Sequence, residues 1–196
     1  MISVICMICA SFIAVPGVQA ATVAQTNKKA DQKFNSKMKS IRKNSQFSIR
    51  YKYVDITGDG IHEALVEYKP KTQGGSSQKF DVYTYKSGKV KRILTTTEYG
   101  LSKCTYYRKA GSLIVYGTGH GGEWYRYYKL QSNGKYKYIT QKARTAIAGG
   151  SVSNGPWQYY KGGSILTKIT ARKFNSLNAS LKKGKRLAFS RWKELA

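Results

Sequence analysis

The residues best suited to chemistry lie close together, between Asp55 and Glu67. The chain has nine Asp and Glu residues in all, and four of them fall within this short segment. It begins Asp-Ile-Thr-Gly-Asp-Gly-Ile-His-Glu, with oxygen-bearing side chains at the first, third, fifth and ninth places. The glycine at the sixth place permits a sharp turn, and the seventh residue can offer its carbonyl, as in calcium-binding loops. The candidate metal ligands are Asp55, Thr57, Asp59, Ile61 and Glu63.

The same segment can also be ordered without an ion. Asp55 and Asp59 can accept hydrogen bonds from backbone N–H groups a few residues further on, as in an Asx turn. If an ion binds, oxygen donors on a flexible loop favour calcium, because magnesium demands near-ideal octahedral geometry. We therefore expect a structural calcium ion, with the metal-free turn as the alternative.

The residues around this segment decide which kind of calcium loop it could be. Its twelfth place, where an EF-hand carries a bidentate Glu, is Val66, and the flanking residues alternate as strands do. The segment instead resembles the strand–loop–strand calcium loop of FG-GAP repeats, of the integrin-α propeller type, which reads D-x-D/N-x-D-G-x-x-D/E. Ala64–Tyr68 resembles the apolar strand that follows that loop. The wider composition is similar to that of small exported proteins of Gram-positive bacteria. The resemblance implies a calcium loop between two strands.

A second candidate site is the glycine-rich loop Gly117–Glu123. It contains His120 and Glu123, which could act as an acid–base pair or bind a metal. A flexible hairpin loop with an incidental histidine is the alternative. Beyond the predicted signal peptide, the sequence has no nucleophile elbow, CxxC or HExxH motif. We therefore do not predict an enzyme, and a small extracellular hydrolase that uses this loop is kept as the alternative function.

The charge of the chain bears on its partners. Lys and Arg number 35 against 9 Asp and Glu, which gives a formal net charge of +26. A charge of this size concerns solubility and association, not the fold. Neither a zinc-finger nor an RNP signature is present, so nucleic acid is not the expected partner. We expect a binding or structural module that associates with an anionic cell-wall polymer or another polyanion, with peripheral membrane contact as a further option.

Residues 1–20 are interpreted as a signal peptide. They carry no charge, are mostly apolar, and end in Val18-Gln19-Ala20, which fits a signal-peptidase site. The apolar part is short for a membrane span, which takes about 20 predominantly apolar residues. The protein is therefore expected to be secreted or associated with the cell wall, with an uncleaved anchor as the alternative. Cleavage would leave Cys104 as the only cysteine and exclude an internal disulfide bond.

The N-terminal part of the remaining chain predicts a helix. Residues 21–46 read as a polar linker that leads into an amphipathic helix from about Ala30. Its apolar residues Ala30, Phe34, Met38 and Ile41 follow helical spacing. We expect this stripe to pack on a sheet, with the lysines in solvent. Contact with an anionic membrane is the alternative.

Residues 47–196 are predicted to form one β-rich domain. Short runs rich in Tyr, Val and Ile alternate with period two and are joined by turns such as Ser87-Gly88 and Asn133-Gly134. Consecutive hairpins predict an antiparallel meander, either an open sheet or barrel-like. Thr170 can cap a helix over residues 171–182. The predicted class is α+β, mainly β, with an N-terminal and a C-terminal helix.

Tyrosines and basic residues alternate along several of these strands, as in Tyr125-Arg-Tyr127 and Tyr136-Lys-Tyr138. Alternation places the two kinds of side chain on opposite faces of a sheet. We expect the tyrosines to face the core. Exposed tyrosines that stack on sugars are the alternative.

Overall fold

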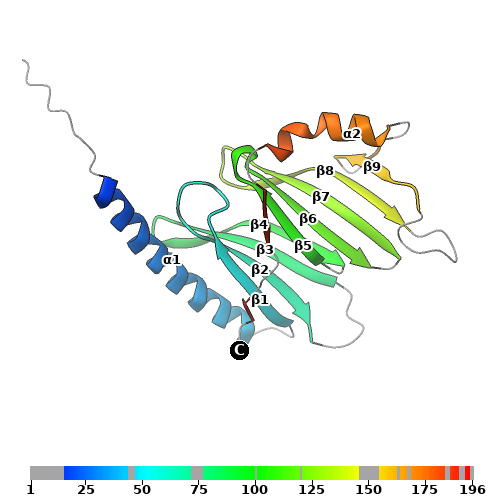
Figure 1. Cartoon of the computed structure of the whole chain (residues 1–196). Helices are drawn as coiled ribbons and strands as arrows, with labels where there is room; N and C mark the ends of the chain where they lie inside the picture. The colour runs from blue at the N-terminus through cyan, green and yellow to red at the C-terminus, as the bar shows by residue number, and fades with distance from the viewer. Residues whose placement is uncertain are drawn as a thin grey trace, which may run out of the picture.

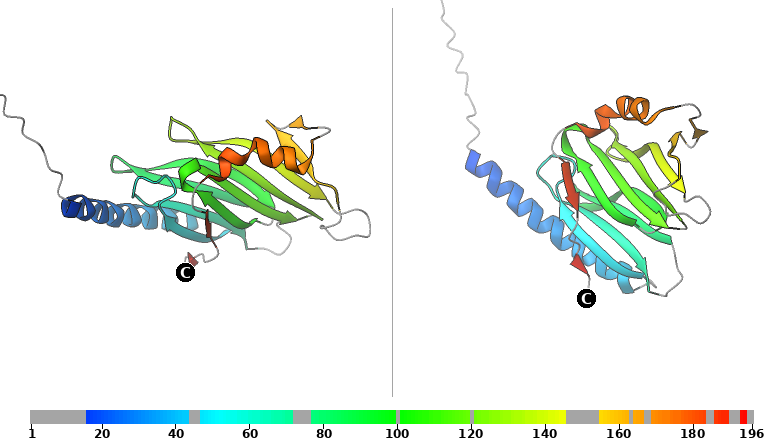
Figure 2. Two further views of the ribbon diagram at one scale, coloured as in Figure 1. Left: turned by 45° about the horizontal axis from the view of Figure 1, so that its top comes forward. Right: turned by 45° about the vertical axis from the view of Figure 1, so that its right-hand side comes forward.

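The fold is a stack of two antiparallel sheets between two helical elements (Figure 1). The computed structural model describes residues 16–43, 47–71, 77–99, 101–119, 121–145, 155–162, 164–166, 169–183, 186–189 and 193–194. Helix α1 spans Pro16–Lys43, and helix α2 spans Ala171–Leu177 and continues into the 3-10 helix η3, Ala179–Lys182. Figure 2 shows α1 along one sheet and α2 over the other, with the first turns of α1 projecting beyond the sheet.

The first sheet has the strand order β12-β1-β2-β3-β4, and the second has the order β10-β9-β8-β7-β6-β5-β11. The strands of the first sheet are β1 Phe47–Val54, β2 Glu63–Pro70, β3 Ser77–Lys86, β4 Lys89–Tyr99 and β12 Lys193–Glu194. Those of the second are β5 Leu101–Tyr107, β6 Ser112–Gly119, β7 Gly122–Leu130, β8 Tyr136–Thr145, β9 Gln158–Lys161, β10 Ser164–Ile165 and β11 Arg186–Phe189. The 3-10 turn η1, Arg108–Ala110, joins β5 to β6.

The predicted fold class is confirmed, and the structure decides between its two forms. The protein is mainly β with one N-terminal and one C-terminal helix, and the sheets are not closed into a barrel. Consecutive strands pair as hairpins within each sheet. The last described strands return to the edges, because β11 pairs with β5 and β12 pairs with β1.

Helix α1 covers the outer face of the first sheet. Its predicted stripe residues Ala30, Phe34 and Met38 are fully buried against Ile49 and Val66, among others. This contact confirms the prediction that the stripe packs on a sheet. Burying such side chains contributes about 1.5–3 kcal/mol each for the larger ones.

The start of α1 differs from the expectation. Residues 21–29, predicted to be a polar linker, are helical, and the helix begins at Pro16. The physical reason lies in composition, because Ala, Gln and Lys are good helix formers and proline is well tolerated in the first turn. Polar side chains of this stretch face solvent, as in Thr22 and Gln25. Residues 1–15, most of the predicted signal peptide, lie outside the described residues. None of the described helices is apolar over enough of its length to cross a bilayer.

The main core lies between the two sheets. Leu65, Phe80 and Val82 from the first sheet meet Cys104, Tyr106, Leu113 and Val115 from the second. Cys104 is completely buried, and burial raises the pKa of its thiol. A smaller cluster on the outer face of the second sheet packs Phe174 and Leu181 on Tyr127 and Tyr159. The predicted C-terminal helix is present, with Thr170 accepting the N–H of Lys173, but its α-helical part ends at Leu177 and residues 179–182 form η3.

Candidate functional site

The acidic loop joins β1 to β2 at one end of the first sheet, beside η1 of the second sheet. Its backbone turns at Gly58 and Gly60, which both have φ near 85°. Glycine adopts such values without steric cost, whereas other residues do so rarely. A Cβ atom at Gly58 would also lie 3.1 Å from the side chain of Arg108. The two glycines therefore set the shape of the loop and let the second sheet approach it.

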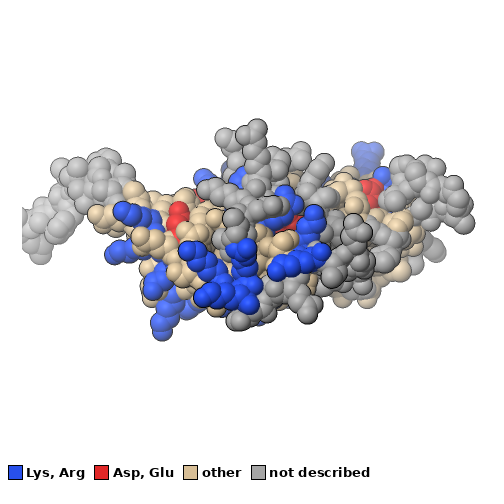
Figure 3. Space-filling model, turned by 90° about the horizontal axis from the view of Figure 1, so that it is seen from below, with Lys and Arg blue, Asp and Glu red and all other residues tan. Residues whose placement is uncertain are grey.

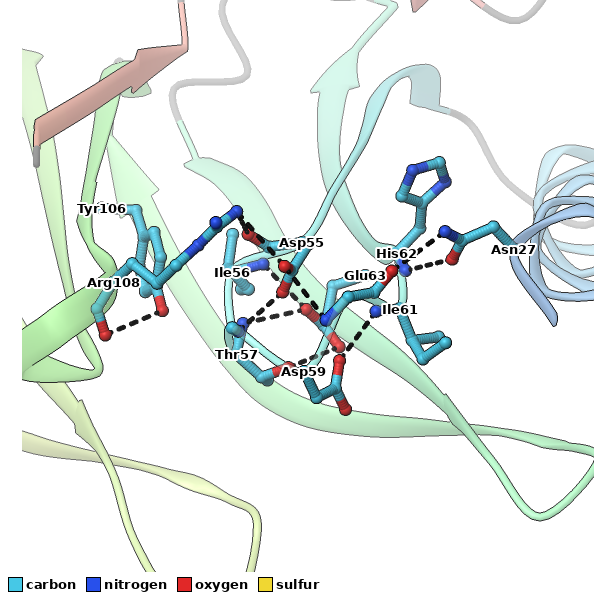
Figure 4. Close-up of polar contacts among 12 residues, drawn as sticks. Asn27, Asp55, Ile56, Thr57, Asp59, Ile61, His62, Glu63, Tyr106 and Arg108 are labelled. Carbon is cyan, nitrogen blue, oxygen red and sulfur yellow. Dashed lines mark hydrogen bonds and ion pairs between the residues drawn. The ribbon is translucent and has the colours of Figure 1, made fainter. Parts of the chain in front are cut away.

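Asp55 is fully engaged by the loop and by one arginine (Figure 4). Its Oδ1 accepts the N–H of Gly58 at 2.6 Å, and its Oδ2 accepts the N–H of Gly60 at 3.2 Å. Nη2 of Arg108 lies 3.2 Å from Oδ2 and also donates to the Asp55 carbonyl at 3.0 Å. The guanidinium of Arg108 thus forms an ion pair with Asp55, the first carboxylate of the predicted metal site.

Glu63 lies beneath the loop, with no exposed surface. Its Oε2 accepts the N–H groups of Ile56 at 2.9 Å and Thr57 at 3.1 Å, while its Oε1 accepts the hydroxyl of Thr84 at 3.0 Å. Burial raises the pKa of this carboxyl to about 7, although the hydrogen bonds oppose the shift. Glu63 therefore ties the loop to β2 and β3 from the inside.

The predicted ligands do not converge on one point. Asp59 is exposed and uses its Oδ1 to accept the N–H of Ile61 at 2.9 Å. Thr57 directs its hydroxyl to Glu63. Within the described ranges, no group of three or more His, Cys, Asp or Glu residues is placed to hold a metal ion. In this arrangement the carboxylates of the loop accept backbone N–H groups as in an Asx-type turn, and calcium binding stays a prediction.

Helix α1 holds the other side of the loop. The side chain of Asn27 donates to the Gly60 carbonyl at 2.9 Å and accepts the N–H of His62 at 2.7 Å. The ring Nδ1 of His62 lies 3.0 Å from Oδ1 of Asp31. Sequence reasoning missed Asn27 and Arg108, because they lie far from the loop along the chain and no local pattern connects them to it.

Two further acids are buried in the first sheet and were not among the predicted site residues. Asp81 accepts the hydroxyls of Tyr68 at 2.9 Å and Tyr83 at 2.8 Å, with Nζ of Lys79 at 3.4 Å. Glu67 lies 3.4 Å from Nη1 of Arg50. An acid at an alternating position inside an apolar strand is the signal that could have indicated such a buried pair.

The second predicted site is only partly described. His120 lies outside the described residues, and Glu123 lies at the start of β7. The Glu123 carboxylate accepts the hydroxyl of Tyr116 at 2.9 Å and forms an ion pair with Arg144. Glu123 is thereby held as a buried carboxylate between the hydroxyl of Tyr116 and the guanidinium of Arg144.

Many other basic side chains lie on the surface. Those of α1 are exposed, and Figure 3 shows Lys and Arg spread over the molecule seen from below, with few Asp or Glu. A hollow of about 490 Å³ opens beside the acidic loop, between the β3–β4 and β7–β8 turns. Its described lining includes Lys86, Lys91, Arg92 and Lys135, with Asp59 as the one acid.

Comparison with known proteins finds no matching family model, no matching curated protein and no matching solved structure.

Proposed function

We propose that this chain is an exported module that associates electrostatically with an anionic polymer of the cell envelope. The proposal is supported by the observation that most acidic side chains form hydrogen bonds or ion pairs within the fold. Of nine acidic residues, Asp55, Glu63, Glu67, Asp81 and Glu123 are bonded within the fold. They neutralise little of the outer surface, so the excess of Lys and Arg is presented to solvent and attracts polyanions.

Helix α1 supplies one part of this cationic surface. Its lysines and arginine outside the apolar stripe are exposed, and Asp31 is the one acid along the helix. The exposed cations are Lys28, Lys29, Lys33, Lys37, Lys39, Arg42 and Lys43. Because the apolar stripe is already covered by the sheet, these side chains serve a charged partner and not insertion into a lipid layer.

The hollow beside the acidic loop supplies a second part. Lys86, Lys91 and Lys135 are exposed at its rim, so their ammonium groups retain water until a partner arrives. Its volume lies within the range of small-molecule sites, which extends over about 300–1,000 Å³. A charged repeat unit of a polymer can therefore enter it, while the α1 cations hold neighbouring units.

Retention of the purified protein on isolated cell walls tests the proposal. We expect NaCl to elute the protein, with little retained at about 1 M, where the Debye length is about 3 Å. Replacing Lys86, Lys91 and Lys135 by Gln should lower the NaCl concentration needed for elution. The matched control removes three exposed cations elsewhere, Lys69, Lys71 and Lys109, and should lower it less. Retention that is insensitive to salt would contradict the proposal.

The proposal includes a calcium ion at the Asp55–Glu63 loop as a stabiliser only. In the arrangement described above, Arg108 already supplies a positive charge to Asp55. An ion would therefore have to displace this guanidinium and draw Asp59 inward. The resemblance to FG-GAP loops supports this part of the proposal, and the present hydrogen bonds of the carboxylates oppose it.

Thermal unfolding with and without calcium tests this part. An ion that binds only the folded state stabilises it by about 2.7 kcal/mol at a hundredfold excess over Kd. Arg108→Gln removes the competing cation, so the calcium-induced rise in Tm should be larger in this variant than in the original chain. Magnesium is the control ion. If calcium at about 1 mM raises the Tm of neither protein, the loop is a metal-free turn.

A further inference from the structure

A second hollow lies on the outer face of the second sheet, where η3 leaves the strands β5 to β8 uncovered. It has a volume of about 300 Å³ and is lined by four tyrosines and two lysines, with one threonine and one isoleucine among the other described lining residues. The named residues are Tyr107, Tyr116, Tyr125, Tyr127, Lys142 and Lys182. Neighbouring strands contribute every second residue, which places these side chains on one face.

The tyrosines form a continuous aromatic wall. The rings of Tyr116 and Tyr125 lie 4.7 Å apart between centroids, and the ring of Trp157 lies 5.9 Å from that of Tyr125. Tyr107, Tyr116 and Tyr125 are only partly buried, unlike Tyr106 and Tyr128 in the main core. The expectation that tyrosines face the core therefore holds for the inner face of this sheet, and the outer face presents tyrosines to the hollow.

Both lysines lie over aromatic rings at this hollow. Nζ of Lys142, on β8, lies 4.3 Å from the ring centre of Tyr125 and 4.2 Å from that of Trp157. Nζ of Lys182, on η3, lies 5.7 Å from the ring centre of Tyr127. Partial burial lowers the pKa of both ammonium groups. Each ammonium group also forms a cation–π interaction with a ring face.

No acid lies among the described lining residues of this hollow. The Glu123 carboxylate lies outside this lining, although its charge acts on Lys142, and it is bonded to Arg144 and to the hydroxyl of Tyr116. The lysines are thus held at the rim of a partly desolvated, aromatic hollow without a protein carboxylate in the lining to neutralise them. A negative group of a ligand gains more from such cations than from fully solvated ones.

We propose that this hollow binds a single sugar unit that carries a negative group, with the ring against the tyrosines and the carboxylate or phosphate between Lys142 and Lys182. The faces of tyrosine rings offer an apolar surface to the C–H groups of a sugar, and their hydroxyls offer hydrogen bonds to its hydroxyls. The volume is at the lower end for ligand sites, which suits one ring. The site uses none of the residues around the acidic loop and does not depend on the proposed association with the cell envelope.

Isothermal titration with four probes tests this inference. The probes are glucuronate, glucose 6-phosphate, neutral glucose and inorganic phosphate. We expect at least one of the two anionic sugars to bind with one-to-one stoichiometry and to bind about tenfold more tightly than glucose or phosphate. Comparison of glucuronate with glucose 6-phosphate then shows whether the negative group is a carboxylate or a phosphate.

Variants localise the binding. Lys182→Gln removes an exposed cation and should lower the affinity for the anionic sugar by about tenfold. Tyr107→Ala removes part of the aromatic wall and should also lower this affinity. Lys69→Gln removes one exposed charge on β2, outside both hollows, and should leave the affinity unchanged. Equal weakening by Lys69→Gln, binding of phosphate as tight as that of the sugars, or no binding of either anionic sugar would each overturn the inference. Wall retention through Lys86, Lys91 and Lys135 is measured separately, so either proposal can fail without the other.

Discussion

The acidic loop and the aromatic hollow of the second sheet use charged residues in opposite ways. In the loop, the carboxylates of Asp55 and Glu63 accept hydrogen bonds from four backbone N–H groups. In the hollow, the ammonium groups of Lys142 and Lys182 lie over aromatic rings at the edge of an open space. The two acids are close together in the sequence and accept hydrogen bonds within the protein. The two lysines are distant in the sequence and line the same surface hollow.

The chemistry of the two groups explains the difference. A carboxylate accepts hydrogen bonds, and a tight turn exposes several N–H groups that the sheet ladder does not use. An ammonium group can only donate, and the backbone carbonyls inside a sheet are already occupied by the ladder. Carboxylates clustered in a turn can therefore find hydrogen-bond donors in the backbone of that turn. A lysine on a strand remains available to solvent, an aromatic ring or a ligand.

The largest effect on stability is expected at Glu63. Glu63→Ala leaves the N–H groups of Ile56 and Thr57 without their acceptor in a buried place, which costs about 3 kcal/mol of the free energy of unfolding. Glu63→Gln keeps an acceptor oxygen and should cost clearly less. Urea unfolding followed by tryptophan fluorescence measures both. Equal losses for Ala and Gln would show that the hydrogen bonds to Ile56 and Thr57 do not hold the loop.

A smaller effect is expected at Asp55. Asp55→Ala removes two acceptors of backbone N–H groups and the partner of Arg108, and should lower the free energy of unfolding by about 2 kcal/mol, the upper range for such capping carboxylates. Asp59→Ala is the matched control, because Asp59 is exposed and accepts one hydrogen bond, and should cost about 0.5 kcal/mol. The same unfolding assay applies. A larger loss at Asp59 than at Asp55 would mean that the two acids have been assigned the wrong roles.

The smallest effect is expected in the aromatic hollow. Lys182→Gln removes an exposed cation whose only described ring contact is with Tyr127, so the free energy of unfolding should change by no more than about 0.5 kcal/mol. Differential scanning calorimetry provides the measurement. A Tm reduced as much as in Asp55→Ala would show that Lys182 is a structural residue, and the contrast between the two regions would then disappear.

Local sequence patterns predicted the elements well where the signal was itself local. The turns expected at Ser87-Gly88 and Asn133-Gly134 contain positive-φ residues at Ser87, Gly88 and Gly134, as tight hairpins require. Ala30, Phe34 and Met38 of the α1 stripe are buried and Ile41 is partly buried, because helical spacing sets which side chains share a face. Helix α1 begins at Pro16 and not near Ala30, because good helix formers extend a helix without an apolar stripe.

The amino-acid sequence by itself determined the strands, the hairpins, the buried face of α1 and the turn at Gly58 and Gly60, because each depends on neighbours within a few residues. Only the tertiary structure decided which charges meet. Arg108, next to the second sheet, contacts Asp55 in a loop of the first, Asn27 reaches the same loop from α1, and Lys182 lines the same hollow as Lys142. These contacts depend on how the layers stack, and periodicity along the chain carries no information about the partner of a side chain that lies on another layer.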